Sequence, residues 1–409
     1  MVVDFADTAE MAAFRTEVRS FIEQHYPADL LEEARSGNAI EGETGNTPNP
    51  TPEEVALEQK LEPWKQALAQ KGWIAAAFPK ELGGAALTPM EQYVLNAEFA
   101  RAGVRRVQIR ADLASVLLMS GTEEQKKQHL PGLISAEVRW AQGYSEPGAG
   151  SDLASLQTRA IRDGDEFVVN GQKIWTSNAR RSQWLFGLFR TDPDAPKHRG
   201  ISYLLMDLKT PGITIRPMQQ MTDAWGFNEV FFEDVRVPVK NVVGEMNRGW
   251  YIGATLLDFE RSNIGDAVGT VRTLDHLRGL LVDEQRKGSG RSRLNRPAIR
   301  AELTDRYVEA NVAGLFSQRV MTIQNRGMVP NYEASVAKVF STELNRTIGN
   351  TAVKSLGLHG YLWGREPLAP ANGRWSHMYL GATSMTIGGG TSEIQRNIIA
   401  TRGLGLPRG

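Results

Sequence analysis

The stretch Met385-Thr-Ile-Gly-Gly-Gly-Thr-Ser-Glu-Ile-Gln-Arg396 carries more information about fold and function than any other part of this sequence. Its three glycines run directly into Thr391-Ser392, and the isoleucines that follow have helical spacing. Ser392 and Gln395 fit the S-x-x-Q capping box, so we expect a helix to begin here. The N–H groups and positive dipole end of such a helix suit an anion such as a pyrophosphate, although an ordinary capped helix has the same pattern.

Composition sets limits on the class of protein. The chain has 409 residues, with 47 lysines and arginines against 47 aspartates and glutamates, and no cysteine. This length supports two or three cores, and the balanced charge gives no reason to expect nucleic acid or an anionic membrane as a partner. Without cysteine there are no disulfides, thiolate ligands or thiol nucleophiles. The start lacks the features of a signal peptide, and no apolar run reaches the ~18 residues that span a bilayer, so we expect a cytoplasmic protein.

The first third of the chain has mostly helical patterns. Helical spacing of apolar residues covers 8–25, with Thr8 as a cap, and returns over 90–101 and 122–134. Thr51-Pro-Glu-Glu54 is a capping box with proline at the first helical position. The polar segment 36–50 before it is longer than most loops inside compact domains, and such loops usually carry function or move.

The pattern changes near Trp140 to short strands. Asp163-Gly164 and Asn170-Gly171 are typical of two-residue hairpin turns, and Lys173-Ile-Trp-Thr176 continues the strand pattern. Further strands are expected over 182–190, 201–208, 212–217 and 229–238. This middle block predicts a small antiparallel β-barrel or sandwich.

Long helical patterns return after Gly249, over 250–285, 297–325 and 331–356, and predict a four-helix bundle. We therefore predict an α+β fold with three domains: an N-terminal α domain (1–139), a middle β domain (140–248) and a C-terminal helical bundle (249–409). The α–β–α order, without alternating strands and helices, argues against a Rossmann domain.

Two further segments carry groups suited to a ligand. In Tyr144-Ser-Glu-Pro-Gly-Ala-Gly-Ser-Asp-Leu153, glycines such as Gly150 allow close approach of the backbone, and Ser145 and Ser151 add hydroxyl donors. A polar turn between domains explains the same residues. Strand periodicity would place Trp175 and Ser177 on one face, where they could stack on and hydrogen-bond a flat heteroaromatic ring, although a core tryptophan is the plainer alternative.

Together, these three segments resemble the acyl-CoA dehydrogenases, flavoenzymes that desaturate acyl thioesters. The resemblance covers nearly the whole chain and includes the α–β–α order and the Gly121-Thr-Glu-Glu-Gln125 run. It implies FAD bound non-covalently, with the flavin ring against the middle domain. By position in the motifs, the resemblance implies that four residues contact the flavin or its pyrophosphate: Gln142, Ser145, Gly150 and Ser151. It also implies that Trp175 and Ser177 flank the flavin ring. Thr391 and Glu393 are implied to lie near the rest of the dinucleotide.

The catalytic base is displaced relative to many family members, which carry a glutamate immediately before Gly-Thr-Ser. Here that position is Gly389. The isovaleryl- and long-chain-like branch instead has its glutamate in the first long C-terminal helix, in a setting similar to Leu257-Asp-Phe-Glu-Arg-Ser262. The resemblance therefore implies Glu260 as the base, beside Arg261 at the substrate, and a backbone N–H at Gly389 that polarises the thioester. Taken without the family pattern, Glu260 beside Arg261 would be a solvated helix-face charge.

Gly388 and Gly389 stand where relatives hold Tyr-Glu, so we expect a roomier acyl pocket that admits branched, cyclic or steroid-derived groups. The chain also departs from the family at its cross-subunit FAD contacts. Relatives show Arg-x-x-Phe-Gly where this chain has Arg286-Lys-Gly-Ser-Gly290, so that Ser289 replaces the aromatic residue. They show Gln-x-x-Gly-Gly where it has Lys354-Ser-Leu-Gly-Leu358.

The sequence thus predicts a FAD-dependent acyl-CoA dehydrogenase that forms a trans-2-enoyl-CoA and passes electrons to an electron-transfer flavoprotein. We expect a homotetramer or homodimer, with a heterotetramer containing a related chain as the alternative, since a partner could complete the altered FAD contacts. Two other functions stay open: an oxygen-using flavoenzyme of the same fold, and a non-catalytic subunit. The six histidines show no metal-ligand spacing, so we expect no metal.

Overall fold

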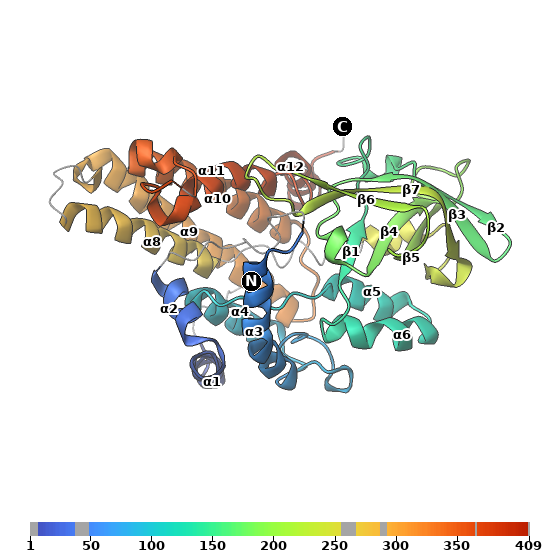
Figure 1. The fold of residues 1–409 in the computed structure, drawn as a ribbon, viewed down its shortest axis with the longest axis horizontal. Coiled ribbons are helices and arrows are strands. Elements are labelled where there is room, and N and C mark those ends of the chain that lie inside the picture. The colour runs from blue at the N-terminus through green and yellow to red at the C-terminus, as the bar shows by residue number, and fades with distance from the viewer. Residues whose placement is uncertain (1–6, 37–48, 255–266, 287–292, 365, 408–409) are drawn as a thin grey trace. The chain divides into compact units, whose positions relative to one another are not determined.

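The computed structural model describes residues 7–36, 49–254, 267–286, 293–364 and 366–407 (Figure 1). These residues belong to two compact units. The helical unit draws on Met1–Glu41, Leu87–Arg106 and Arg261–Gly409, and the sheet unit draws on Gly42–Ala86 and Val107–Glu260. Among the described residues, no helix has the length and apolar character needed to cross a bilayer.

The helical unit contains eight described α-helices: α1 (Ala9–His25), α2 (Ala28–Ser36), α4 (Pro89–Ala102), α8 (Ala267–Arg286), α9 (Pro297–Asn325), α10 (Tyr332–Leu356), α11 (Arg374–Met385) and α12 (Ser392–Ile398). Thr8 caps α1 as predicted, because its hydroxyl accepts a hydrogen bond from the N–H of Met11. Pro297 occupies the first turn of α9, where its missing N–H costs no hydrogen bond.

The C-terminal helices form the predicted four-helix bundle. Helices α8, α9, α10 and α11 pack together (Figure 1), and α10 contacts each of the other three. The core between them is aliphatic with one large aromatic residue; it contains Leu274, Leu277, Leu281, Leu303, Ala310, Leu344, Ile348 and Trp375. Burial of this apolar surface, rather than helix propensity, supplies most of the stability of such a bundle.

The sheet unit combines α-helices with a sheet. Its described helices include α3 (Pro52–Gln70), α5 (Ala111–Ser120) and α6 (Glu123–Ile134), and residues 249–254 are also helical. Thr51 and Glu54 form the predicted capping box of α3, and Thr122 with Gln125 forms another at the start of α6. The amide of Gln125 also donates to the carbonyl oxygens of Lys240 and Val242, both at 2.8 Å.

The sheet has eight strands: β1 (Trp140–Gly143), β2 (Arg159–Asp163), β3 (Glu166–Lys173), β4 (Trp184–Arg190), β5 (Ile201–Asp207), β6 (Ile213–Met218), β7 (Phe227–Pro238) and β8 (Val242–Val243). Their order is β6-β7-β3-β2-β4-β5-β8, with β1 paired to β4 outside this path. Antiparallel pairing predominates as predicted, but β4 pairs in parallel with both β1 and β2.

Both faces of the central strands are buried. Along β4, Leu185 and Phe189 enter one hydrophobic core, whereas Phe186 and Leu188 enter a second core that contains residues of α5 and α6. Strand β5 alternates in the same way. The central strands therefore have continuous runs of apolar residues, instead of an alternation of apolar and polar residues.

One of the two predicted hairpin turns is wrong. Strands β2 and β3 are joined by a two-residue turn at Gly164-Asp165, next to the predicted Asp163-Gly164. Asn170-Gly171 instead lies inside β3, at a break in the register with β7. Gly171 has φ +144°, and a Cβ there would lie 2.7 Å from the hydroxyl oxygen of Thr158. A bulge and a close backbone approach thus explain this glycine.

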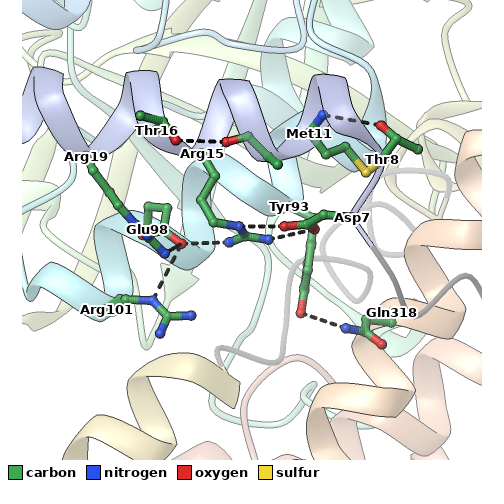
Figure 2. Close-up of polar contacts among 11 residues, drawn as sticks. Asp7, Thr8, Met11, Arg15, Thr16, Arg19, Tyr93, Glu98, Arg101 and Gln318 are labelled. Carbon is green, nitrogen blue, oxygen red and sulfur yellow. Dashed lines mark hydrogen bonds and ion pairs between the residues drawn. The ribbon is translucent and has the colours of Figure 1, made fainter.

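A buried carboxylate joins α1 to α4 in the helical unit. Glu98 is 1% exposed and accepts hydrogen bonds from Arg15 and Arg19, both at 2.6 Å, with Arg101 at 3.5 Å (Figure 2). Arg15 also pairs with Asp7 at 2.8 Å. Burial acts to raise the pKa of Glu98, but the hydrogen bonds from Arg19 and Arg15 outweigh it and hold that pKa below its usual value.

We predict that Glu98→Gln lowers the melting temperature at pH 7, because the arginines lose their counter-charge, at a cost of about 1–3 kcal/mol. A lowered native pKa means that the stabilisation is complete above the ordinary glutamate pKa and is lost as pH falls through the native one. Melting curves from pH 7 to pH 3 should therefore converge for the two proteins at acid pH. The exposed Glu32 of α2 is the control, and equal curves for Glu98→Gln and Glu32→Gln would refute the assignment.

Candidate active site

A buried ion pair joins two of the predicted ligand segments in the sheet unit. Lys173, the last residue of β3, is 0% exposed, and its Nζ lies 2.8 Å from Oε1 of Glu146. The same ammonium donates to the carbonyl oxygen of Tyr144 at 3.1 Å and lies over the ring of Phe189. The sequence predicted no role for Glu146 or Lys173, because a pair of residues 27 positions apart leaves no local pattern.

Glu146 in turn orders the loop that contains it. Its carboxylate accepts hydrogen bonds from the N–H groups of Gln157 at 2.6 Å and Thr158 at 2.9 Å. Burial raises the pKa of this carboxyl, but the Lys173 ammonium and these N–H groups outweigh burial, so that the pKa lies below its usual value. Burial also lowers the pKa of Lys173, against the attraction of Glu146.

The loop presents open backbone next to its predicted donors. A Cβ added at Gly148 or Gly150 would meet no atom within 4 Å. Ser145 is half-buried and Ser151 is exposed. In β1, the amide nitrogen of Gln142 is buried and has no hydrogen-bond partner among the described residues. A buried donor without an acceptor is costly, so its presence points to a ligand group.

The predicted shared strand face of Trp175 and Ser177 is wrong. Strand β3 ends at Lys173, and Trp175 adopts a left-handed conformation with φ +60°. Such a conformation is unfavourable for a bulky residue and is found most often at functional sites. The indole is 54% exposed and meets the ring of Phe227 edge to face at 5.8 Å. Ser177 is exposed and follows it in the same turn.

The glycine loop of the helical unit follows α11. We use this name for residues 386–390. The N–H of Gly388 donates to the carbonyl oxygen of Ser384, and the N–H of Ser392 donates to that of Thr386. Gly389 and Gly390 have φ +65° and +87°. Glycine tolerates these left-handed conformations, which side chains with a Cβ rarely adopt.

The predicted capping box at Ser392 is also wrong. Thr391 is the N-cap of α12, and its hydroxyl accepts from the N–H of Ile394 at 3.2 Å. The amide of Gln395 instead donates to the carbonyl oxygen of Gly389 at 2.8 Å. Glu393 is exposed in the first turn, and hydrogen bonds from its own N–H and from Thr391 hold its pKa below the usual value.

Several predicted residues lie outside this description. Glu260, Arg261 and Ser289 are not among the described residues, and Arg286 ends α8 without a described side chain. Lys354 pairs with Glu302 at 3.4 Å, and Leu358 is 84% exposed. Within the described ranges, no three histidine, aspartate or glutamate side chains gather in a way that could hold a metal ion.

We predict that Glu146→Gln destabilises the protein by about 3–5 kcal/mol, because it leaves the buried Lys173 ammonium without a counter-charge. Adding Lys173→Met to this variant should restore much of the loss, since both charges are then gone. Thermal and urea unfolding of the two single variants and the double variant gives the coupling energy. Glu166→Gln, at an exposed ion pair with Arg236, is the matched control and should change stability little. A Glu146→Gln variant as stable as this control would contradict the prediction.

Comparison with known proteins places the whole chain. The N-terminal, middle and C-terminal domains described for acyl-CoA dehydrogenases match residues 8–137, 141–235 and 247–404. The acyl-CoA dehydrogenase IpdE1 of Mycobacterium tuberculosis is 35% identical over 98% of each chain. The acyl-CoA dehydrogenase FadE26 of the same organism is 36% identical over 84% of this chain and 88% of its own.

Solved structures agree with this placement. The Tcur3481–Tcur3483 steroid ACAD matches with a TM-score of 0.80 and 33% identity, over 99% of this chain and 100% of its own. The ChsE4–ChsE5 complex of Mycobacterium tuberculosis matches with a TM-score of 0.81 and 32% identity over the same shares. With its three domains matched in order and its relatives similar over full length, the chain belongs to the acyl-CoA dehydrogenases, a family of flavoprotein oxidoreductases.

Proposed function

We propose that this chain catalyses the α,β-dehydrogenation of an acyl-CoA thioester to a trans-2-enoyl-CoA, with FAD as its cofactor. Full-length similarity to proteins named acyl-CoA dehydrogenases supports the reaction class. We assign its three domains to 1–139, 140–248 and 249–409, close to the limits of the family matches. The residues of each unit are assigned below to steps of this reaction.

The residues of the sheet unit suit a flavin. Gln142 offers a buried amide donor that has no partner among the described residues, and Trp175 offers an exposed indole for stacking. Ser145, Ser151 and the open backbone at Gly150 suit polar groups of the cofactor. In the helical unit, Thr391 and Glu393 are assigned to the rest of the dinucleotide. When bound, FAD accepts the hydride that leaves the β-carbon of the substrate.

The observation that carries this proposal is the N–H of Gly389. It donates no hydrogen bond to any described residue, and neither does the N–H of Gly390, whereas the N–H of Gly388 donates to Ser384 and the carbonyl of Gly389 accepts from Gln395. As the α-proton leaves, negative charge develops on the thioester carbonyl oxygen. A backbone N–H held ready for that oxygen stabilises the transition state, and a glycine supplies it as well as any residue.

Glu260 is the proton acceptor in this scheme. It takes the α-proton onto a carboxylate oxygen while the β-hydrogen departs with its electron pair, so that the double bond forms between the two carbons. Arg261 follows it in the chain and is assigned to the substrate. A carboxylate in a dry pocket is a stronger base than one in water, because desolvation raises its pKa.

Substrates with bulky acyl groups fit the glycine loop. A Cβ at Gly388 would meet only the carbonyl oxygen of Ser384, at 3.7 Å, so the space beside this residue is open. One of the similar structures is named a steroid ACAD. We therefore assign branched or ring-containing acyl-CoA thioesters to this chain in preference to unbranched ones.

Electron-transfer flavoprotein is the proposed electron acceptor, and the proposed assembly is a homo-oligomer. Arg286 and Ser289 are assigned to the FAD of a neighbouring subunit. Two similar structures, the Tcur3481–Tcur3483 steroid ACAD and the ChsE4–ChsE5 complex, each carry the names of two proteins, which makes a heteromer the competing assembly. Light scattering of the chain expressed alone, with FAD per subunit from absorbance, distinguishes the two assemblies.

The reaction is tested by anaerobic titration of the purified protein with linear, branched and ring-containing acyl-CoAs. We expect the flavin absorption band to bleach and a trans-2-enoyl-CoA to appear by mass spectrometry. Reoxidation should be slow in air and fast with electron-transfer flavoprotein. Rapid reoxidation by oxygen would instead support the oxygen-using alternative, and absence of bound FAD or of bleaching would overturn the proposal.

We predict that Glu260→Gln lowers the rate of flavin reduction by ~10²–10⁴-fold, the usual contribution of a general base, while FAD stays bound. Stopped-flow absorbance under anaerobic conditions measures this rate, and the flavin-to-protein absorbance ratio measures occupancy. Glu32→Gln, on the surface of α2, is the control for removing a glutamate. Near wild-type reduction by Glu260→Gln would remove this residue from the mechanism.

We predict that Gly388→Leu discriminates against bulky substrates. The added side chain fills open space without a positive φ to strain it, so the fold should be unaffected. The ratio of kcat/KM for a ring-containing acyl-CoA to that for a short linear one should fall by ~10-fold or more, the order that steric mismatch in a pocket produces. An unchanged ratio would show that Gly388 does not face the acyl group.

A further inference from the structure

A second fully buried lysine holds the glycine loop. Lys338 of α10 is 0% exposed, and its Nζ donates to the carbonyl oxygen of Met385 at 3.1 Å and of Gly390 at 2.8 Å. These two carbonyls lie at either end of the glycine loop. Met385 also ends α11, so its carbonyl belongs to the negative end of that helix dipole, where a cation is favoured.

The loop offers little of its own to fix its shape. Glycines have a wide choice of backbone conformations, and three in succession lose much entropy when ordered. Burial of the Lys338 ammonium is unfavourable and lowers its pKa, while the carboxylates of Glu343 and Glu393 act against that shift. An apolar side chain would fill the same space without this cost, but it would leave two carbonyls without their donor.

The hydrogen bonds of the glycine loop lie on both sides of the peptide group between Gly388 and Gly389. On one side of it, the N–H of Gly388 is bonded to Ser384. On the other side, the carbonyl of Gly389 is bonded to Gln395 and the carbonyl of Gly390 to Lys338. The peptide between Gly388 and Gly389 therefore has neighbours fixed on both sides, while its own N–H stays available. That N–H is the donor assigned above to the thioester oxygen.

We propose that Lys338 is a positioning residue of the reaction: its ammonium clamps the two ends of the glycine loop and so aims the Gly389 N–H at the thioester carbonyl. This inference rests on the proposed function for the identity of the acceptor. The clamp itself is independent of it. Gln395 acts with Lys338 as the second tie.

Lys338→Met tests the clamp, because methionine fills a similar volume without a donor. We expect flavin reduction to slow by ~10–100-fold, the order that misplacement of a catalytic group by about 1 Å produces. The dissociation constant of the acyl-CoA should stay within about threefold, since the carbonyl interaction strengthens chiefly in the transition state. Arg346→Met, which removes an exposed cation from the same helix, is the matched control.

A readout of carbonyl polarisation separates positioning from loss of structure. A bound 3-oxoacyl-CoA ionises to its enolate more readily when donors face the thioester oxygen. At fixed pH, Lys338→Met should hold a 10–100-fold smaller ratio of enolate to neutral ligand, seen in the absorption spectrum. A wild-type ratio together with wild-type flavin reduction would overturn the proposal.

Chemical rescue tests whether the ammonium is the active group. Because the chain contains no cysteine, Lys338→Cys can be alkylated at this one position, in denaturant before refolding with FAD. Treatment with 2-bromoethylamine restores an ammonium at nearly the length of lysine, and 1-bromopropane gives a neutral chain of the same length. We expect the charged adduct to regain flavin reduction and the neutral one to stay slow. Equal rates for the two adducts would count against the proposal.

Hydrogen exchange in the absence of substrate distinguishes failure of the clamp from failure of the proposed function. In Lys338→Met, the amides of Gly388 and Ser392, which donate to the carbonyls of Ser384 and Thr386, should exchange at least about tenfold faster than in wild type. Unchanged exchange overturns the clamp, whatever the reaction. Faster exchange in a protein that no acyl-CoA reduces would instead overturn the proposed function. If Lys338→Met does not fold, Lys338→Gln, which keeps one donor group, is read in the same assays.

Discussion

The ion pair between Glu146 and Lys173 is the interaction that joins the two segments of the sheet unit assigned to FAD. One charge lies in the loop that follows β1 and the other at the end of β3, and both are buried. Either charge alone would be unfavourable there, so their pairing stabilises the arrangement in which the two segments meet. The segments they join contain Ser145, Trp175 and the open glycines assigned to FAD. The same ion pair therefore stabilises the sheet unit and brings together the segments assigned to the cofactor.

The helical unit also contains a buried lysine that supports a glycine-rich loop. Lys338, like Lys173, is completely buried and donates to main-chain carbonyls of a glycine-rich segment. Glycine-rich loops give ligands close access to the backbone, but they order themselves poorly. An ammonium on a long stem can reach several carbonyls from inside the protein, which leaves the outer surface of the loop clear. Both lysines support their loops from the protein interior.

The helices and strands of this fold could be predicted from local sequence patterns. The detailed backbone and side-chain geometry of the candidate site could not. Helix α9 has the predicted limits of 297–325, and the capping box at Thr51 occurs where expected, because it depends on residues three apart in the sequence. The bulge at Gly171 involves a close approach to Thr158 in another segment, and β3 ends at Lys173, which pairs with Glu146 from a distant part of the sequence. Lys338 donates hydrogen bonds to carbonyls that lie 47 and 52 residues away in the sequence. The periodicity of apolar residues within a helix does not predict contacts at such separations. Thr391 and Ser392 are both suitable N-cap residues by sequence, and only the direction of their side chains in the structure shows that Thr391 is the N-cap.

The three glycines of the loop differ in what they would tolerate, and this difference bears on how such an enzyme diversifies. A side chain at Gly390 would collide with Gln395 at 2.6 Å, and both Gly389 and Gly390 have backbone angles that other residues adopt only with strain. Gly388 has neither constraint. In the backbone conformation of this chain, Gly388 is therefore the glycine of the three that accepts a side chain without a close contact or a positive φ. Under the proposed function, a substitution at Gly388 would change substrate preference and leave the Gly389 N–H in place.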